Sequence, residues 1–217
     1  SVVEHFDEIV EAAYSVSLFT TWQGRDVDQV WVKQRMSEAA EPDPRWLGAA
    51  LADSARHPLA GMPVENCTQQ LGVPGPSHER LPHFRLEFTP SAGEELQSEY
   101  LLPRAFAAEE FESLASIADQ IAPVLQVSEI RTIAADDFWM SPSFGRDSVA
   151  FHFTWVKDDA AVRPVMAAVE ERLAPFAPRP HWGKLFSVEP EAVCAQYPKL
   201  PDFRALVERH DPEGKFR

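Results

Sequence analysis

The first part of the chain alternates apolar and polar positions in a way that predicts one helix followed by a β-hairpin. Apolar side chains recur every three or four positions over residues 2–13, so they lie on one face of a helix. Residues 14–22 are rich in β-branched and aromatic types, and residues 29–35 alternate between apolar and polar side chains. Because the turn-forming Gly24 lies between these two runs, we expect them to pair as neighbouring strands.

Residues 36–90 show little periodicity and hold many of the 19 prolines in the chain. Proline interrupts helices and strands because it lacks a backbone N–H and its ring clashes with the preceding turn. We therefore expect a long, packed excursion without regular elements. Loops of this length in compact domains tend to be functional or to cover another surface.

Strand and helix patterns alternate from residue 96 onward. We predict a strand over 96–102, a helix over 107–122, strands over 125–134 and 149–156, and a helix over 160–173. This order favours an α+β domain, with a large antiparallel or mixed sheet that helices cover on one face, of ferredoxin-like type. We expect residues 1–217 to form a single domain.

Composition and charge narrow the classes of partner and compartment. The net charge of -14 and the scattered positions of the 20 Lys and Arg residues argue against a nucleic-acid partner. No run approaches the roughly 18 consecutive apolar residues of a membrane span, so we expect no membrane partner. Cys67 and Cys194 lie far apart and form no C-x-x-C motif, which fits a reducing compartment, and we predict a cytoplasmic location.

The predicted strand over residues 149–156 separates an aromatic face from a polar one. Alternate side chains of a strand point to opposite faces of the sheet. Phe151, Phe153 and Trp155 share one face, which we expect to pack against the helices. His152 and Thr154 share the other face, which we expect to be polar and open.

A carboxylate and a guanidinium are predicted to face the same way on the neighbouring strand. Glu129 and Arg131 are two residues apart, so they share a face. With His152 and Thr154 they would supply the donors and acceptors that suit a polyhydroxylated ligand. Taken singly, Glu129 and Arg131 could form an exposed ion pair, and His152 could be a structural histidine. Gln97 is a weaker candidate for the same pocket, and a structural role for it is equally plausible.

The segment Arg-Pro-His-Trp-Gly-Lys at residues 179–184 has a mixture of side chains that a protein core rarely needs. Lys184 must keep its ammonium group solvated or paired, and Gly183 contributes no packing. We interpret this segment as one wall of a site that faces the same pocket as Glu129 and Arg131. For Trp182, simple packing remains the alternative.

Several familiar site motifs are absent from the sequence. There is no G-x-G-x-x-G, no P-loop and no G-x-S-x-G. The seven histidines show no zinc-ligand spacing, and His78 and His83 with Glu79 and Glu87 give only a weak metal pattern. We therefore predict no metal site, and we expect the chain to bind a substrate without carrying a cofactor of its own.

Several motifs together resemble the C-terminal substrate-binding domain of bacterial alditol (xylitol) oxidases, and the resemblance spans essentially the whole chain. The Glu-x-Arg and His-Trp-Gly-Lys motifs are shared with the wider sugar-lactone oxidase family, which includes the D-arabinono-1,4-lactone oxidases. This family belongs to the flavoproteins of vanillyl-alcohol oxidase type. The run Tyr-Ser-Val-Ser-Leu-Phe and the segment Gly-Val-Pro-Gly-Pro favour alditol oxidases. The matching stretches are residues 13–20, 72–76, 78–85, 128–132, 152–155, 179–184 and 211–216.

The resemblance implies an oxidoreductase of two domains. An N-terminal domain, which we expect outside this chain, would bind FAD, usually covalently, and residues 1–217 would cap the flavin and supply the substrate pocket. The full enzyme would oxidise the terminal primary alcohol of a polyol such as xylitol or sorbitol to an aldose, and reduce dioxygen to hydrogen peroxide. The isolated domain would be inactive. The alternatives are a domain of an oxidase of gulono- or arabinono-1,4-lactone, or a stand-alone non-catalytic carbohydrate-binding module.

The resemblance also implies roles for particular residues. Arg131 and Lys184 would stabilise the oxyanion that develops from the reacting hydroxyl, while Lys184 or His152 could instead relay its proton. Glu129 would orient the substrate hydroxyls and hold Arg131. His181 would lie near the flavin edge. The expected substrate-binding residues are Glu129, Arg131, Thr154, Lys184 and His152.

Overall fold

The structure, a computed structural model, describes residues 2–40, 43, 45–88 and 93–216. Its strands form one sheet in the order β2-β1-β4-β5-β3-β6, and every neighbouring pair is antiparallel. The α+β prediction is therefore confirmed, with an antiparallel sheet. The strands are β1 (Ser15–Thr20), β2 (Gln29–Lys33), β3 (Glu95–Pro103), β4 (Leu125–Ile133), β5 (Ser148–Val156) and β6 (Arg179–Pro180).

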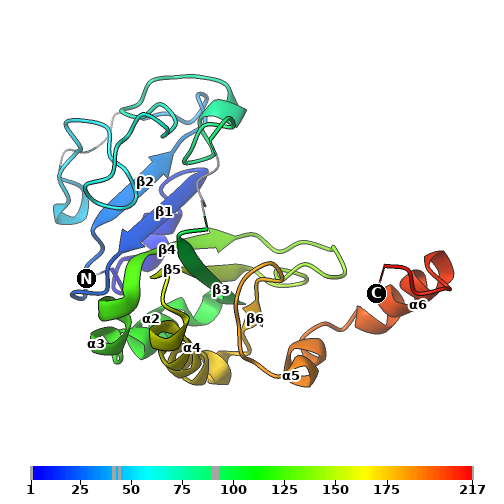
Figure 1. Ribbon diagram of the computed structural model, residues 1–217. Coiled ribbons are helices and arrows are strands. Elements are labelled where there is room, and N and C mark those ends of the chain that lie inside the picture. Colours follow the sequence, from blue (N-terminus) through cyan, green and yellow to red (C-terminus); the bar gives the residue numbers. More distant parts are fainter. Residues whose placement is uncertain (1, 41–42, 44, 89–92, 217) are drawn as a thin grey trace.

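The helices cover one face of this sheet. Figure 1 shows α2, α3 and α4 together on that face, while α5 and α6 extend away from the sheet beyond β6. Short 3-10 turns join several of these elements. The helices are α1 (Phe6–Val10), α2 (Ala107–Ala115), α3 (Ala118–Ile121), α4 (Asp159–Leu173), α5 (Pro190–Ala195) and α6 (Leu200–His210).

The order of elements explains the sheet order. The run β3-α2-β4-β5-α4-β6 is a β-α-β-β-α-β unit, and its strands lie side by side as β4-β5-β3-β6, as in ferredoxin-like folds. The β1–β2 hairpin extends this unit, because β1 pairs with β4. The predicted hairpin and the predicted ferredoxin-like arrangement are both confirmed.

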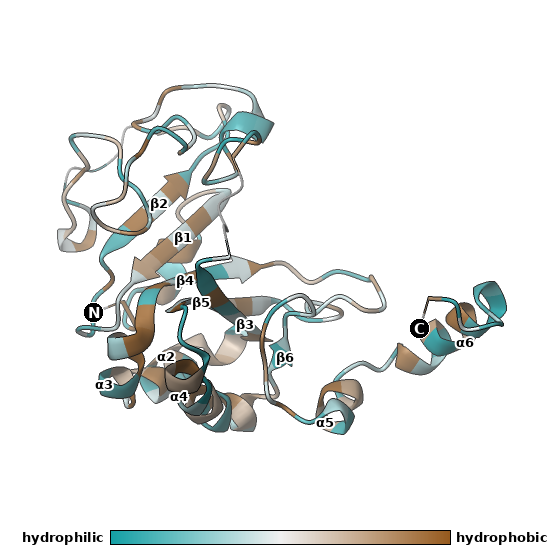
Figure 2. Cartoon of the chain, viewed as in Figure 1, coloured by the Kyte–Doolittle hydropathy of each residue, from teal (hydrophilic) through white to brown (hydrophobic). Residues whose placement is uncertain are grey.

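The aromatic face of β5 forms the centre of the core. Phe151, Phe153 and Trp155 are each 0% exposed and share one apolar cluster with Leu114 of α2 and Val169 of α4. The rings of Phe153 and Trp155 stack with their centroids 4.9 Å apart. The apolar residues of the strands, brown in Figure 2, thus meet the apolar stripes of the helices, as the alternation predicts.

Two helix predictions need correction. In the predicted helix over residues 2–13, only Phe6–Val10 is α-helical, although its apolar side is buried as expected. The predicted helix over residues 107–122 breaks after Ala115, and Ile117 has φ -121° before α3 begins. The Ser116 hydroxyl donates to the carbonyl of Ser113 at 2.6 Å, and such local bonds compete with regular helix geometry.

The first strand of the hairpin is also shorter than predicted. Its pattern over residues 14–22 suggested a strand through Trp22, but Trp22 has φ 55° and leaves the strand. The second strand ends at Lys33 rather than at residue 35. The prediction missed β6, α5 and α6 altogether. Proline in the first turn of α5 and of α6 was an available signal, because proline suits the first turn of a helix.

The predicted excursion over residues 36–90 packs against the hairpin in its described parts. Positions 41–42, 44 and 89–90 lie outside the described residues. The Gln29 amide of β2 donates to the carbonyl of His57 at 3.0 Å, and the Thr68 hydroxyl donates to the carbonyl of Pro82 at 2.7 Å. In Figure 1 the excursion lies beside β1 and β2, away from the helices, so it covers the second face of the sheet at that end.

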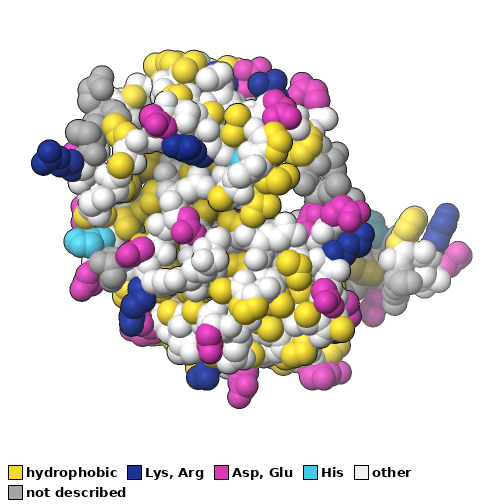
Figure 3. All heavy atoms as spheres, turned by 60° about the vertical axis from the view of Figure 1, so that its left-hand side comes forward, with side chains coloured by type: hydrophobic (Ala, Val, Ile, Leu, Met, Phe, Trp, Pro, Cys, Tyr) yellow, Lys and Arg dark blue, Asp and Glu magenta, His cyan; other side chains and the backbone are white. Residues whose placement is uncertain are grey.

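Three further observations concern the surface charges, the cysteines and the length of the apolar helices. Figure 3 shows one face of the molecule on which Lys and Arg side chains lie separately rather than in a continuous stripe. Cys67 and Cys194 are both free thiols. Within the described residues, no helix is both long and apolar enough to cross a lipid bilayer.

We predict that Phe151→Ala lowers the free energy of unfolding by about 3–5 kcal/mol, because it leaves a cavity in the centre of the core. Urea unfolding of the purified chain measures this change. The control is Phe138→Ala, which removes a side chain that is 71% exposed and should change stability by less than about 0.5 kcal/mol. Similar losses in both variants would contradict the proposed core.

Candidate functional site

Polar side chains lie side by side on the face of the sheet opposite the helices. Glu129 of β4 is paired with His152 of β5, and His152 is paired on its other side with Glu99 of β3. Arg131 lies two residues beyond Glu129 and so shares this face. Thr154 lies next to His152 in the same way. The structure therefore brings together the four residues that strand alternation predicted to converge.

Glu99 links two of the predicted site residues. Its Oε1 accepts a hydrogen bond from Arg131 at 2.8 Å, and its Oε2 accepts one from the Lys184 ammonium at 2.6 Å. Glu99 is only 3% exposed, so both contacts form in a largely dry environment. Lys184, from the segment after β6, thus meets Arg131 at the same carboxylate.

Glu129 has a second set of partners. Its Oε2 lies 3.4 Å from Arg131 and its Oε1 lies 2.9 Å from His83 Nε2. The Lys33 ammonium lies 3.1 Å from His83 Nδ1. Because an ammonium group can only donate, Nδ1 is the acceptor and the Nε2–H of His83 donates to Glu129.

Three cations and two carboxylates, with the His83 ring between Lys33 and Glu129, form this chain of contacts, which we name the charged row. It runs across the polar face from β2 to the segment after β6. Each carboxylate in it has at least two hydrogen-bonding partners, as buried carboxylates require. The members of the charged row, in order, are Lys33, His83, Glu129, Arg131, Glu99 and Lys184.

The charges of the row shift the pKa values of its members. Burial alone would raise the pKa of Glu99, but Arg131 and Lys184 outweigh it and hold this pKa at about 2. Burial opposes ionisation of Glu129 too, and the hydrogen bond from His83 together with Arg131 holds its pKa at about 2. Burial lowers the pKa of Lys33 to about 8. Both carboxylates are therefore ionised at neutral pH.

Backbone contacts direct the segment 179–184 towards the charged row. The amide of His181 donates to the carbonyl of Glu99 at 2.9 Å, which continues the pairing of β6 with β3. The ring Nδ1 of His181 accepts from the amide of Gly183 at 3.1 Å, and this tight turn presents Lys184. Arg179 is turned away, since its guanidinium donates to the carbonyls of Pro142 and Phe144.

Comparison with known proteins identifies the family. The profile of the family described as D-arabinono-1,4-lactone oxidase matches residues 93–217. An alditol oxidase of Streptomyces sp. (strain IKD472 / FERM P-14339) is 57% identical over 211 residues, which cover 97% of this chain and 50% of that protein. The chain belongs to the D-arabinono-1,4-lactone oxidase family.

Two other relatives have lower sequence identity to this chain. An L-gulono-1,4-lactone dehydrogenase of Mycobacterium tuberculosis is 30% identical over 55% of this chain and 28% of its own length. A long-chain alcohol oxidase of an uncultured marine euryarchaeote is 27% identical over 49% of this chain and 23% of its own length. The predicted resemblance to alditol oxidases is confirmed, and the chain spans about half the length of that curated relative.

In this member of the family, His152 carries an unbonded ring nitrogen. Its Nε2 is buried and has no hydrogen-bond partner among the described residues. Burial, and then the nearby charge of Lys184, lowers the pKa of His152 to about 4. The imidazole is therefore neutral at pH 7, and it can donate one hydrogen bond and accept another.

The remaining predicted residues lie next to His152 or at the edge of the site. Gln97 is paired with Thr154 across β3 and β5, so it shares the polar face, where its amide donates to Glu95 at 3.2 Å. His181 lies in the turn that presents Lys184, with its ring bonded to Gly183. Its predicted proximity to a flavin stays a prediction.

Sequence reasoning missed three members of the charged row. Glu99 could have been found, because it lies two residues after Gln97 and must share its face. His83 and Lys33 meet only through the packing of the excursion on β2, and no local pattern signals that contact. The His83 ring lies 2.9 Å from Glu129, a residue that the weak metal pattern did not include. Within the described ranges, no three His, Cys, Asp or Glu side chains are grouped to hold a metal ion.

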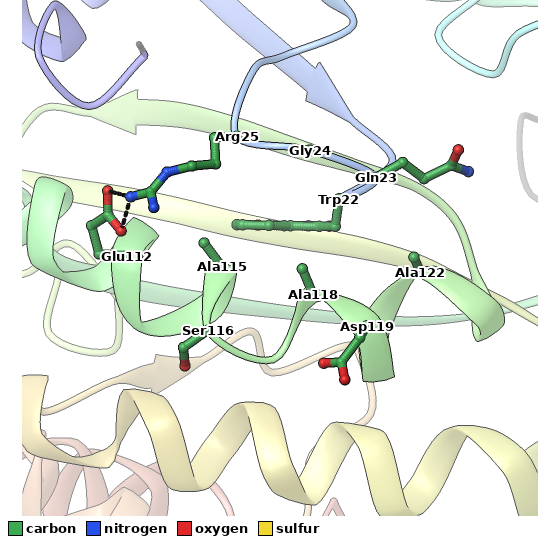
Figure 4. A pocket seen from close by; sticks show the side chains of 10 residues that line it. All are labelled: Trp22, Gln23, Gly24, Arg25, Glu112, Ala115, Ser116, Ala118, Asp119 and Ala122. Atoms are coloured by element: carbon green, nitrogen blue, oxygen red, sulfur yellow. Dashed lines mark hydrogen bonds and ion pairs between the residues drawn. The ribbon is translucent and has the colours of Figure 1, made fainter.

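A separate hollow of about 640 Å³ lies on the helix side of the sheet. Figure 4 shows Ala115, Ala118 and Ala122 facing Trp22 across it, with the ion pair of Arg25 and Glu112 at one end. None of the members of the charged row lines this hollow. Its polar side chains lie at the rim, where Arg25 is paired with Glu112, and the hollow is separate from the charged row.

We predict that His152 makes stability depend on pH between about 6.5 and 4. Its pKa falls from the ordinary 6.5 to about 4 on folding, so in this window the unfolded chain binds the proton more readily. The free energy of unfolding should therefore decrease as the pH is lowered, by on the order of 2 kcal/mol. Urea unfolding at pH 7 and at pH 4.5 measures the difference.

The variant His152→Gln should lose this part of the pH dependence. His78→Gln, at an exposed position, should retain it. If His152→Gln and the unchanged chain lose equal stability between the two pH values, the imidazole is not held neutral by folding.

Proposed function

We propose that this chain is the substrate-binding domain of an FAD-dependent alditol oxidase. The observation that supports this most directly is the pair of cations, Arg131 and Lys184, held by one buried carboxylate beside the neutral His152. Such a site offers fixed positive donors and a neutral imidazole on a surface that also carries hydroxyl and carboxylate groups. This combination suits an alcohol substrate with several hydroxyls.

The site residues would donate to and accept from the reacting hydroxyl of the substrate. Oxidation of an alcohol requires that the hydroxyl proton leaves and that negative charge on the oxygen is stabilised. Arg131 and Lys184 each have further N–H groups beyond those bonded to Glu99, and these can donate to the oxygen. The unbonded Nε2 of His152 can accept a hydrogen bond from a substrate hydroxyl.

The other hydroxyls of the polyol would bind along the polar face. Glu129 keeps lone pairs that can accept hydrogen bonds from substrate hydroxyls, while His83 and Arg131 hold the carboxylate in place. Thr154 and Gln97 can donate or accept beside it. Fixing several hydroxyls at once orients the terminal carbon and lowers the entropic barrier to reaction.

A bound FAD would accept the hydride, and dioxygen would reoxidise it with formation of hydrogen peroxide. We propose that a flavin domain of the same full-length chain holds this FAD, because the alditol oxidase is twice as long as the matched region. The covalent link that the resemblance implies is part of this proposal. In this proposal, residues 1–217 form the wall that would face the flavin, with His181 on the flavin side. The free thiols Cys67 and Cys194 fit the cytoplasmic location that we propose.

A lactone substrate is the second candidate. The family description names D-arabinono-1,4-lactone, and one relative is named for L-gulono-1,4-lactone. The much higher identity to an alditol oxidase, over nearly the whole chain, favours a polyol.

Peroxide formation by the full-length protein tests the proposal. We expect release of hydrogen peroxide with xylitol and sorbitol, and kcat/KM values lower by at least about tenfold with L-gulono-1,4-lactone. Measurement with each substrate in air-saturated buffer gives the comparison. A preference for the lactone would contradict the polyol assignment. Failure to oxidise either class of substrate would contradict the proposed oxidase activity.

We predict that Lys184→Met in the full-length enzyme lowers kcat by about 10²–10³, because it removes one donor to the developing oxyanion. Steady-state kinetics with saturating xylitol measures this loss. Lys157→Met is the matched control, since Lys157 is exposed and bonded only to Glu94 in the described contacts. Unimpaired turnover by Lys184→Met would exclude the oxyanion role.

A further inference from the structure

Glu99 occupies a position that no site prediction included. Its two carboxylate oxygens are divided between two cations, with Oε1 bonded to Arg131 and Oε2 to Lys184. Its backbone carbonyl accepts the amide of His181, in the turn that carries Lys184. The same residue thus holds the Lys184 segment by its main chain and the Lys184 ammonium by its side chain.

The two cations need an anion between them. Like charges repel strongly where water is largely excluded, and Arg131 and Lys184 both approach the same point on the polar face. The Lys184 side chain is 16% exposed and the Arg131 side chain 37%, so water screens this repulsion only in part, and Glu99, which is 3% exposed, supplies the compensating charge. Without Glu99, the two cations would be expected to separate or to reorient.

We infer that Glu99 is a positioning residue that fixes Arg131 and Lys184 in the geometry needed to act on one substrate oxygen. This inference rests on the proposed function for its link to catalysis. The contacts themselves do not depend on the identity of the substrate.

The role of a catalytic base does not suit Glu99. Both of its oxygens are engaged by cations, and those cations hold its pKa at about 2 in spite of burial. A carboxylate with so low a pKa takes up a proton poorly at neutral pH. Glu99 therefore acts through Arg131 and Lys184 rather than on the substrate.

Glu99→Gln in the full-length enzyme tests this role, because it keeps the size of the side chain and removes its charge. We expect kcat with xylitol to fall by about 10²-fold, as displacement of catalytic groups by about 1 Å produces, and KM to change much less. Glu94→Gln is the matched control, at the residue immediately before the same strand, with a side chain that is 78% exposed. Its kcat should stay within about twofold of the unchanged enzyme.

A double-mutant cycle separates positioning from independent effects. If Glu99 acts through Lys184, the combined loss in Glu99→Gln/Lys184→Met is smaller than the product of the two single losses. A combined loss equal to that product would overturn the inference. So would a kcat for Glu99→Gln that matches the Glu94→Gln control.

Lysine labelling gives a readout that does not require turnover. We expect reductive methylation of Lys184, followed by mass spectrometry of the full-length protein, to proceed severalfold faster in Glu99→Gln than in the Glu94→Gln control. Equal labelling rates would contradict the inference even if the enzyme oxidises polyols. Faster labelling in a protein that oxidises no polyol would support the positioning role while excluding the proposed function.

The conservative variant Glu99→Asp covers the case in which Glu99→Gln does not fold. It retains the charge on a side chain shorter by one methylene group, so Lys184 should remain protected from labelling while kcat falls by a smaller factor. Unprotected Lys184 together with unchanged kcat in Glu99→Asp would overturn the inference.

Discussion

The polar face of the sheet depends on the neutralisation of two buried carboxylates. Isolated ionised groups are very unfavourable in a protein interior, so Glu99 and Glu129 are stable there only with several charged or hydrogen-bonding partners. Those partners come from distant parts of the sequence, namely the excursion, β4 and the segment after β6, and Lys33 of β2 in turn contacts His83. The charged row therefore ties together elements that the ferredoxin-like core alone would leave loosely connected.

The opposite face of the same strands stabilises the sheet that carries these buried charges. Phe151, Phe153 and Trp155 bury their rings against α2 and α4, and this burial is the main favourable contribution to folding. The residues between them, His152 and Thr154, are then held at fixed positions by a rigid strand. A site built on strands in this way is more accurately positioned than one built on loops.

Much of this architecture follows from the sequence, and the failures have physical causes. Alternation within β4 and β5 correctly placed Glu129, Arg131, His152 and Thr154 on one face, because side-chain direction in a strand is a local property. Helix ends were less predictable, since the apolar spacing continues through the break near Ser116, where a local side-chain hydrogen bond to Ser113 forms. The contact of His83 with Glu129 joins residues 46 positions apart, so it depends on how the excursion folds.

The alternation of faces along β5 has a consequence for how this family can diversify. Residues that contact the helices and residues that face the ligand occupy different positions on the same strand, so ligand preference can change by substitution without disturbing the apolar core. The relatives are named for alditols, lactones and long-chain alcohols, as expected if ligand preference changes in this way. The positions on the polar face do not all tolerate substitution equally. Thr154 and Gln97 can vary singly. A change at Glu99 leaves Lys184 without its counter-ion, and a change at Glu129 removes the carboxylate that Arg131 and His83 share, so either is expected to require a compensating substitution elsewhere.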